Sequence, residues 1–296
     1  MRFAVAVCLA ACFIAAGCGG SSSAQEEPDA STLEQLWRAP GEDVAIVPGS
    51  ADFGPGTVRL TFLVVDGQGR LVTRPTAKVW LARELDAVPF AETTARAEKI
   101  GVDGVEPGEA EEIFVVELEL EEPGTYWVLA EPVGGEKRIQ AVGNVIVQEE
   151  TQAPDVGAAA PASATPTLTN ATLQQLSTAN EPDLELYRSS VAEALAAEEP
   201  FVVAFATPRY CTSRTCGPVV DVVSAVRERH PGLRFIHVEI YEDNDPAQGE
   251  NRWVREWGLP SEPWIFVVGA DGTIRERFEG TVSVRELDEA VSSLPS

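Results

Sequence analysis

The stretch FATPRYCTSRTCGP, residues 205–218, joins two elements that apolar patterns identify. The apolar run 201–206 predicts a buried strand, and valines recur at helical spacing over 219–226. Cys211 and Cys216 therefore fall, in the sequence, where a strand passes into a helix. The unpaired N–H groups and the dipole of a helix start favour anions, so a cysteine there can ionise near neutral pH. This placement predicts redox chemistry rather than core packing.

The chain has five cysteines, and three of them lie near the N-terminus. A positive start and a short apolar run lead to Ala15-Ala16-Gly17-Cys18, which resembles a bacterial lipobox with Ala15 where leucine is usual. The resemblance implies a signal peptide over residues 1–17 and lipid attachment to the Cys18 thiol. The alternative is an ordinary signal peptide that is cut nearby. With either leader the mature protein is exported, where disulfides persist, and Cys211 and Cys216 form either a disulfide or a working dithiol.

Length and charge limit the function classes. A chain of 296 residues with 44% hydrophobic residues is long enough for two domains with cores of their own. The net charge of −25 leaves no large basic face, so nucleic acid is not an expected partner. The predicted organisation is a signal peptide (1–17), a tether (18–38), an all-β domain (39–149), a linker rich in Ala, Pro and Thr (150–175) and an α/β domain (176–296).

Short strand-like segments separated by glycine and proline fill residues 39–149. The segment Ile113–Leu120 alternates apolar and acidic residues, and Pro123-Gly124 marks a turn. Such a series predicts an antiparallel β-sandwich. The motif Gly-Thr-Tyr-Trp-Val-Leu-Ala (124–130) resembles bacterial immunoglobulin-like domains, which implies an immunoglobulin-like sandwich but no activity.

Residues 176–296 show the order α-β-α-β-α-β-β-α and resemble the thioredoxin-like fold. Cys216-Gly217-Pro218 is similar to the family's Trp-Cys-Gly-Pro-Cys, and the segment 259–264 stands where the family carries a cis-proline. The resemblance implies a cis bond between Glu262 and Pro263. The sequence departs from the family at Val219, where the second cysteine would fall, so the pair is a Cys-x4-Cys variant.

The predicted function is extracytoplasmic thiol–disulfide exchange, in which one thiolate attacks a substrate disulfide and the other resolves the mixed intermediate. Which thiol attacks, and whether the protein oxidises or reduces, stays open. No cofactor or metal is predicted; the expected partners are exported proteins with thiols or disulfides, and the cell membrane through the lipid anchor. The candidate site residues are Cys211 and Cys216 for catalysis, Tyr210, Pro218, Glu262 and Pro263 for substrate binding, and Arg209 and Arg214 for lowering the thiol pKa.

Two alternatives remain. The protein could be a non-catalytic binding or scaffold lipoprotein in which Cys211 and Cys216 form a structural disulfide. It could also be similar to the Sco-type copper chaperones, which use two nearby cysteines with a histidine. The histidines of the chain are His230 and His237, and neither is at the position that the copper chaperones use.

Overall fold

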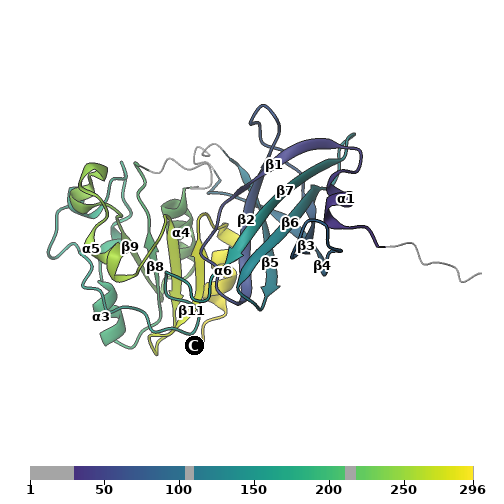
Figure 1. Ribbon diagram of the computed structural model, residues 1–296. Helices are drawn as coiled ribbons and strands as arrows, with labels where there is room; N and C mark the ends of the chain where they lie inside the picture. Colours follow the sequence, from purple (N-terminus) through teal and green to yellow (C-terminus); the bar gives the residue numbers. More distant parts are fainter. Residues whose placement is uncertain (1–29, 104–109, 211–217, 296) are drawn as a thin grey trace, which may run out of the picture. The chain divides into compact units, whose positions relative to one another are not determined.

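The computed structural model describes residues 30–103, 110–210 and 218–295. Residues 31–296 form one compact unit, which contains two sheets (Figure 1). The strands of the first sheet are β1 (Glu42–Pro48), β2 (Gly56–Val65), β3 (Thr76–Ala82), β4 (Ala91–Lys99), β5 (Glu112–Leu120), β6 (Gly124–Pro132) and β7 (Ile139–Val147). The strands of the second sheet are β8 (Phe201–Phe205), β9 (Arg234–Val238), β10 (Trp264–Val268) and β11 (Ile274–Glu279). The helices are α1 (Leu33–Trp37), α2 (Leu173–Leu176), η1 (Leu184–Tyr187), α3 (Val191–Ala196), α4 (Val219–Arg229), η2 (Glu242–Asn244), η3 (Pro246–Gln248), α5 (Arg252–Glu256) and α6 (Val284–Ser292).

The first sheet is a closed barrel with the strand order β1-β2-β5-β4-β3-β6-β7. Strand β1 closes it, because β1 pairs antiparallel with β2 and parallel with β7. Alternating side chains fill the interior, as the pleat of a strand requires. In β5, for example, Val116, Leu118 and Leu120 are buried while Glu117 and Glu119 are not.

The prediction of an immunoglobulin-like sandwich over residues 39–149 is wrong, because the strands close into a barrel. Alternation in a strand such as Ile113–Leu120 indicates one buried face, which sandwiches and barrels share. The barrel is closed by the parallel pairing of residues 42–45 with residues 139–142. That contact joins segments far apart in the chain, and no local pattern encodes it.

The second sheet has the order β11-β10-β8-β9. Only the β8–β9 pair is parallel; β10 is antiparallel to both of its neighbours. All residues of β8 and β10 are buried, since apolar side chains cover both faces of these central strands. Residues of α4 and α6 pack with one face, and residues of α3 and α5 pack with the other. Continuous apolar runs are typical of strands that are covered on both faces.

The prediction of a thioredoxin-like α/β domain over residues 176–296 is also wrong. In the described part of the chain strands predominate over helices, and the α-helices are short, from the four residues of α2 to the 11 of α4. The apolar spacing over 184–195 predicted one helix, but Ser190 caps a new helix and divides the segment into η1 and the six-residue α3. Apolar spacing indicates which side of a segment is buried and does not determine the length of the helix.

The segment 150–175, predicted as a linker, runs beside the second sheet. The backbone N–H of Ile274 donates to the carbonyl of Ala158, and the N–H of Ala160 donates to the carbonyl of Gly272, both at 2.9 Å. Ser163 is also buried, at 2% exposure. These hydrogen bonds cover one end of the edge strand β11.

Candidate functional site

The carboxyl end of β8 brings together three parts of the chain. Phe205, the last residue of β8, lies opposite Val238 of β9 in a parallel pairing and opposite Trp264 of β10 in an antiparallel pairing. The chain continues between these neighbours, because the backbone N–H of Ala206 donates to the Val238 carbonyl at 3.1 Å. Thr207 therefore stands between the residues that follow β9 and the residues that precede β10.

A chain of hydrogen bonds ends at this point. His237 is 1% exposed, and its Nε2 lies 3.0 Å from the Ala206 carbonyl. Because a carbonyl can only accept, Nε2 carries the hydrogen and Nδ1 accepts from the Tyr187 hydroxyl at 2.7 Å. The Tyr187 oxygen in turn interacts with the Ser177 side chain. Burial lowers the pKa of His237 and raises the pKa of Tyr187, so both side chains are neutral at pH 7.

Glu239 follows His237 on the same face and is 5% exposed. One carboxylate oxygen, Oε1, accepts from the backbone N–H of Thr178 at 2.5 Å. The other oxygen, Oε2, is enclosed and has no hydrogen-bond partner among the described residues. The Thr207 hydroxyl oxygen is in the same situation within the described part of the chain. Enclosed polar atoms without partners are uncommon in folded proteins and call for an explanation.

Glu262 lies on the other side of Thr207. Burial and the nearby charge of Glu239 raise the pKa of Glu262 to about 7, against a weaker lowering by the Thr207 backbone N–H. The carboxyl group of Glu262 therefore changes its charge near neutral pH. A side chain with such a pKa can both give and take a proton at neutral pH.

Two tyrosines and an arginine lie around this end of the sheet. The rings of Tyr210 and Tyr241 meet edge to face with centroids 6.3 Å apart. The Arg209 guanidinium carbon lies 5.8 Å from the Tyr210 ring centroid. The backbone N–H of Arg209 donates to the Thr178 hydroxyl at 3.1 Å, which ties the residues after Thr207 to the same segment that binds Glu239.

The structure places some of the predicted site residues and not others. Cys18, Cys211, Arg214 and Cys216 lie outside the described residues. The Glu262–Pro263 bond is cis, and Pro263 is buried beside the end of β8.

Arg209, Tyr210, Glu262 and Pro263 are thus brought together at the carboxyl end of β8, whereas Pro218 belongs to a different setting. Pro218 is the N-cap residue of α4. Pro218 also packs against Gly101, which comes two residues after the barrel strand β4. A Cβ atom added at Gly101 would lie only 2.6 Å from the Cγ atom of Pro218.

Sequence reasoning missed Glu239, Thr207 and the partners of His237. A signal was present, because His237 and Glu239 alternate with apolar residues in an otherwise apolar run. Two polar residues on one face of a buried strand indicate a polar centre under the sheet rather than solvent exposure.

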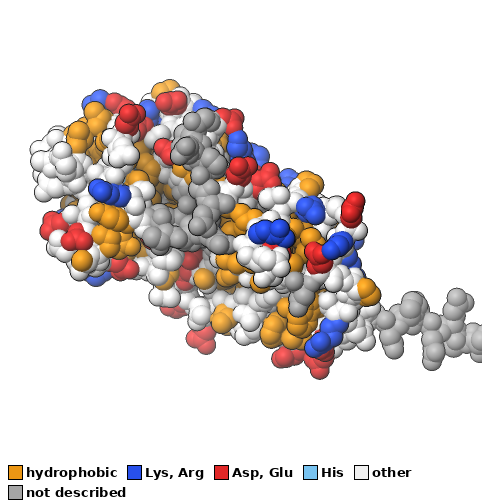
Figure 2. Space-filling model, turned by 90° about the horizontal axis from the view of Figure 1, so that it is seen from above, with side chains coloured by type: hydrophobic (Ala, Val, Ile, Leu, Met, Phe, Trp, Pro, Cys, Tyr) orange, Lys and Arg blue, Asp and Glu red, His pale blue; other side chains and the backbone are white. Residues whose placement is uncertain are grey.

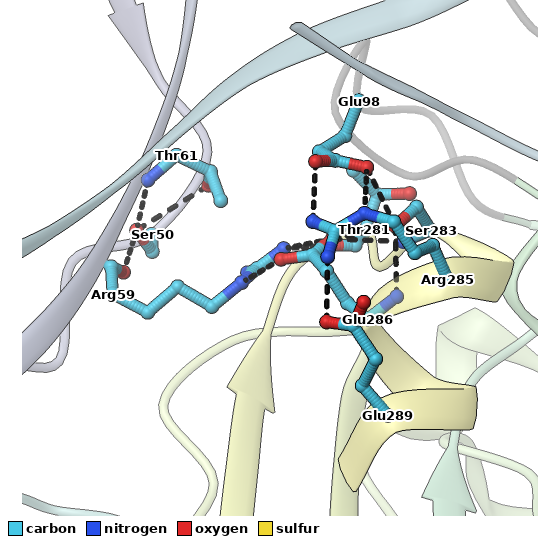
Figure 3. A network of polar contacts seen from close by, with 9 residues as sticks. All are labelled: Ser50, Arg59, Thr61, Glu98, Thr281, Ser283, Arg285, Glu286 and Glu289. Carbon is cyan, nitrogen blue, oxygen red and sulfur yellow. Dashed lines mark hydrogen bonds and ion pairs between the residues drawn. The ribbon is translucent and has the colours of Figure 1, made fainter. Parts of the chain in front are cut away.

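A second polar centre joins the barrel to the second sheet (Figure 3). Arg59 of β2 binds Glu286 of α6 with Nε 2.8 Å from Oε1, and the two side chains are 14% and 10% exposed. Arg285 of α6 pairs with Glu98 of β4, whose carboxylate also accepts from the Ser283 hydroxyl at 3.1 Å. The two arginines and the two glutamates line part of a cavity of about 970 Å³.

A third contact of the same kind lies beside this centre. Arg277 of β11 binds the carboxylate of Asp52 at 3.0 Å, and Asp52 is 2% exposed on its side chain. Gly280, with φ +75°, comes so close to the barrel that a Cβ atom there would lie 2.2 Å from the Gly49 carbonyl oxygen. A side chain at position 280 would therefore meet both steric overlap and backbone strain.

The rest of the described surface gives no sharper site. On the face drawn in Figure 2, basic and acidic side chains are interspersed in small groups. Among the described residues, no group of three or more His, Cys, Asp or Glu side chains could hold a metal ion. No helix in the described ranges is long and apolar enough to cross a membrane.

Comparisons with known proteins leave the chain without a family. No protein-family model matches it, and no curated protein matches it. Among solved structures, it is similar to a part of chitinase ChiW from Paenibacillus sp. str. FPU-7, a cell-surface-expressed multi-modular enzyme, with 16% sequence identity and a TM-score of 0.22. The similarity covers 37% of this chain and 9% of that chain, and it carries no argument for fold or function.

Proposed function

We propose that this protein is an extracytoplasmic thiol–disulfide oxidoreductase that uses Cys211 and Cys216. The observation that carries the proposal is where the two cysteines fall in the chain. They come after β8, whose carboxyl end adjoins a carboxyl group that titrates near neutral pH, and before α4, which begins at Val219. An 11-residue helix presents unpaired N–H groups at its start, which favour a thiolate.

The chemistry needs only the two sulfur atoms and protons. A thiolate of the protein attacks one sulfur of a substrate disulfide, and the other substrate sulfur leaves as a thiolate that takes up a proton. The second cysteine thiol loses its proton and attacks the mixed disulfide, which releases the remaining substrate sulfur as a thiol. Two electrons pass from the dithiol to the substrate, and the protein ends as a disulfide. The reverse sequence oxidises a substrate dithiol.

Tyr210, Glu262 and Pro263 are the described residues that we assign to substrate contact. Arg209 adds positive charge two residues before Cys211 in the sequence, and Arg214 lies between the two cysteines. Positive charge near a thiol lowers its pKa and raises its thiolate fraction. We base these assignments on two facts: the residues lie around the carboxyl end of β8, and the arginines stand close to the two cysteines in the sequence.

Export and anchoring complete the proposal. The lipobox-like segment before Cys18 supports attachment of lipid to that thiol outside the cytoplasm. Labelling of producing cells with a fatty-acid analogue tests this assignment. The label is expected on the wild-type protein and absent from the Cys18→Ala variant; equal labelling of both contradicts lipidation at Cys18.

Thiol–disulfide exchange with glutathione disulfide tests the proposal. The wild-type protein is expected to catalyse exchange, and Cys211→Ser and Cys216→Ser are each expected to reduce the steady-state rate to the uncatalysed level, because the cycle needs both sulfur atoms. The control is Thr212→Ser, which changes a residue between the cysteines and leaves both sulfur atoms in place. Exchange that is undetectable in the wild-type protein would favour a scaffold lipoprotein with a structural disulfide.

Copper binding has less support in the described residues. Both ring nitrogens of His237 already take part in hydrogen bonds with Tyr187 and Ala206. The Nε2 atom of His230, the C-cap residue of α4, lies 2.8 Å from the Asp288 carboxylate. His237 therefore has no ring nitrogen left for a copper ion, and His230 lies at the C-terminal end of α4, whereas the two cysteines precede the N-terminal end of that helix in the sequence.

A further inference from the structure

We propose that an apolar face on the outside of the barrel docks on the surface of the lipid bilayer and fixes how the anchored protein stands on the membrane. The inference rests on the lipid anchor at Cys18, which belongs to the proposed function, and it goes beyond thiol–disulfide exchange. We call this surface the α1 face. Its half-buried and exposed apolar side chains are Leu36, Trp37, Val88, Phe90, Trp127 and Ile146.

Helix α1 forms the centre of the α1 face, where it lies against β3 and β7 on the outside of the barrel (Figure 1). Leu33, at 0% exposure, packs against Trp80 of β3 beneath the helix. At the start of α1, the backbone N–H of Leu33 donates to the Ala87 carbonyl at 2.9 Å. At its end, the Leu36 carbonyl accepts from Gln140 Nε2 of β7 at 2.8 Å. These contacts fix the helix to the barrel at both ends.

Strands β6 and β7 extend the face beside α1. Trp127 lies opposite Asn144 in the β6–β7 register, and Ile146 comes two residues after Asn144. Directly opposite residues and residues two apart share one side of a sheet, so Trp127 and Ile146 lie on the same outer surface. Trp127 packs with the apolar cluster beneath α1, and Ile146 is 51% exposed.

The loop between β3 and β4 adds two exposed apolar side chains. It contains Ala87, which binds the start of α1, and then Val88 at 50% exposure and Phe90 at 54%. The Phe90 ring meets the Tyr126 ring edge to face, with centroids 5.9 Å apart. Exposed apolar side chains that gather in this way mark sites of contact with a membrane or another protein.

The hydrogen bonds of the tryptophans favour a membrane over a dry protein contact. The indole N–H donates to a described acceptor in four of the six tryptophans, namely Trp80, Trp253, Trp257 and Trp264. Within the described ranges, the Nε1 atoms of Trp37 and Trp127 have no acceptor, and both residues belong to the α1 face. A ring with apolar contacts and an N–H that needs a polar partner suits the boundary between bilayer and water, where tryptophan is enriched.

The chain enters the barrel at this face. Residues 19–32 separate the proposed lipid attachment site, Cys18, from α1, which begins at Leu33. A segment of this length spans at most roughly 50 Å when fully extended. The lipid anchor therefore holds the α1 face near the bilayer and raises the effective concentration of the membrane surface there.

Charge does not drive this docking. Arg38, next to Trp37, pairs with Glu34 at 2.7 Å, and Arg83 of the β3–β4 loop pairs with Glu122 at 2.9 Å. These pairs neutralise the two arginines, and the chain as a whole carries a charge of −25, so attraction to anionic lipids is not expected. Apolar and aromatic contact is the remaining attraction, and docking is expected on zwitterionic vesicles without a gain from anionic lipid.

Fluorescence quenching by brominated lipid tests the docking in the full chain. The purified protein is incorporated into phosphatidylcholine vesicles whose acyl chains carry bromine near the ester groups, and flotation with the vesicles measures anchoring separately. The wild-type protein is expected to float and to lose the emission of two of its six tryptophans. The variant carrying Trp37→Phe and Trp127→Phe is expected to float without any quenching.

A second variant keeps every tryptophan and changes only the exposed loop. Val88→Asp combined with Phe90→Asp places two carboxylates on the α1 face, and it is expected to abolish quenching while flotation is retained, because a charge is costly to move out of water. The matched control is Val156→Asp, since Val156 is 54% exposed and lies outside the α1 face. Its quenching is expected to equal that of the wild-type protein.

Several results would overturn the docking. A wild-type protein that floats without quenching is held by its anchor alone, and quenching that persists in the Val88→Asp and Phe90→Asp variant places the contact elsewhere. If the same variant dissociates a dimer that the wild-type protein forms in detergent solution, the α1 face binds a second copy of the chain instead. A wild-type protein that does not float overturns the lipid anchor and the docking together, whereas thiol–disulfide exchange is decided independently by the glutathione assay.

Discussion

Arg59→Ala is expected to lower the free energy of unfolding by about 3 kcal/mol, because it leaves Glu286 ionised at a poorly solvated site without its partner. The two side chains are 14% and 10% exposed and bind through Nε and Oε1 at 2.8 Å. The Arg59 Nη2 atom also donates to the Thr281 carbonyl at 3.0 Å. Urea denaturation of wild type and variant measures the difference.

The matched control is Arg188→Ala. Arg188 and Glu185 form a similar ion pair at 2.6 Å, but their side chains are 64% and 45% exposed, so the loss is expected to stay below about 1 kcal/mol. If both arginine variants lose the same stability, the barrel and the second sheet are not held together by the buried pair.

The Arg59 effect should depend on pH. Burial alone would raise the pKa of Glu286, but the charge and hydrogen bonds of Arg59, with those of Ser283, lower it below its ordinary value. A carboxyl group with a lowered folded pKa contributes stability that is present above its ordinary pKa and lost as pH falls through the folded pKa. The difference between wild type and Arg59→Ala is therefore expected to shrink in acid.

Phe266→Ala is expected to cost about 4 kcal/mol of stability, which is the typical loss for a fully buried aromatic side chain. Phe266 is 0% exposed at the centre of an aromatic cluster. Its ring centroid lies 4.7 Å from that of Trp257, 5.6 Å from that of Trp264 and 6.4 Å from that of Phe205. Removing the ring leaves a cavity between the two tryptophans that the surrounding strands cannot close.

Phe90→Ala provides the comparison, because it deletes the same atoms from a residue that is 54% exposed. Its expected cost is below about 1 kcal/mol. Urea unfolding followed by tryptophan fluorescence distinguishes the two variants. Equal losses would mean that Phe266 is not packed in the core of the second sheet.

The sequence predicted many local elements because their signals are local. The apolar run at 264–268 forms β10, and the capping pattern Ser283-Val284-Arg285-Glu286 begins α6 with the expected reciprocal hydrogen bonds. Strand β4 was missed, since Ala91–Lys99 is polar on one face and has mostly small residues on the other. Its place in the barrel depends on pairing with β3 and β5 rather than on its own composition.

The larger arrangement could not be predicted for the same reason. Whether alternating strands form a sandwich or a closed barrel depends on the distant β1–β7 pairing. The site was predicted in part: Glu262 and Pro263 were named, but Glu239 was not, because its effect comes from the position of its charge near Glu262. Likewise, Arg59 and Glu286 are 227 residues apart in the sequence, and a local pattern carries no information about such a contact.

The proposed function requires that Cys211 and Cys216 form one disulfide that opens and closes reversibly. Equilibration of the purified protein in glutathione buffers of graded potential, followed by alkylation of free thiols and mass measurement, tests it most directly. We expect a single two-electron transition between a form with both thiols alkylated and a form with neither, at a potential within the range of roughly −120 to −270 mV that known exchange proteins span. A bond that remains closed at every potential, or two thiols that never join under oxidising conditions, would contradict the claim.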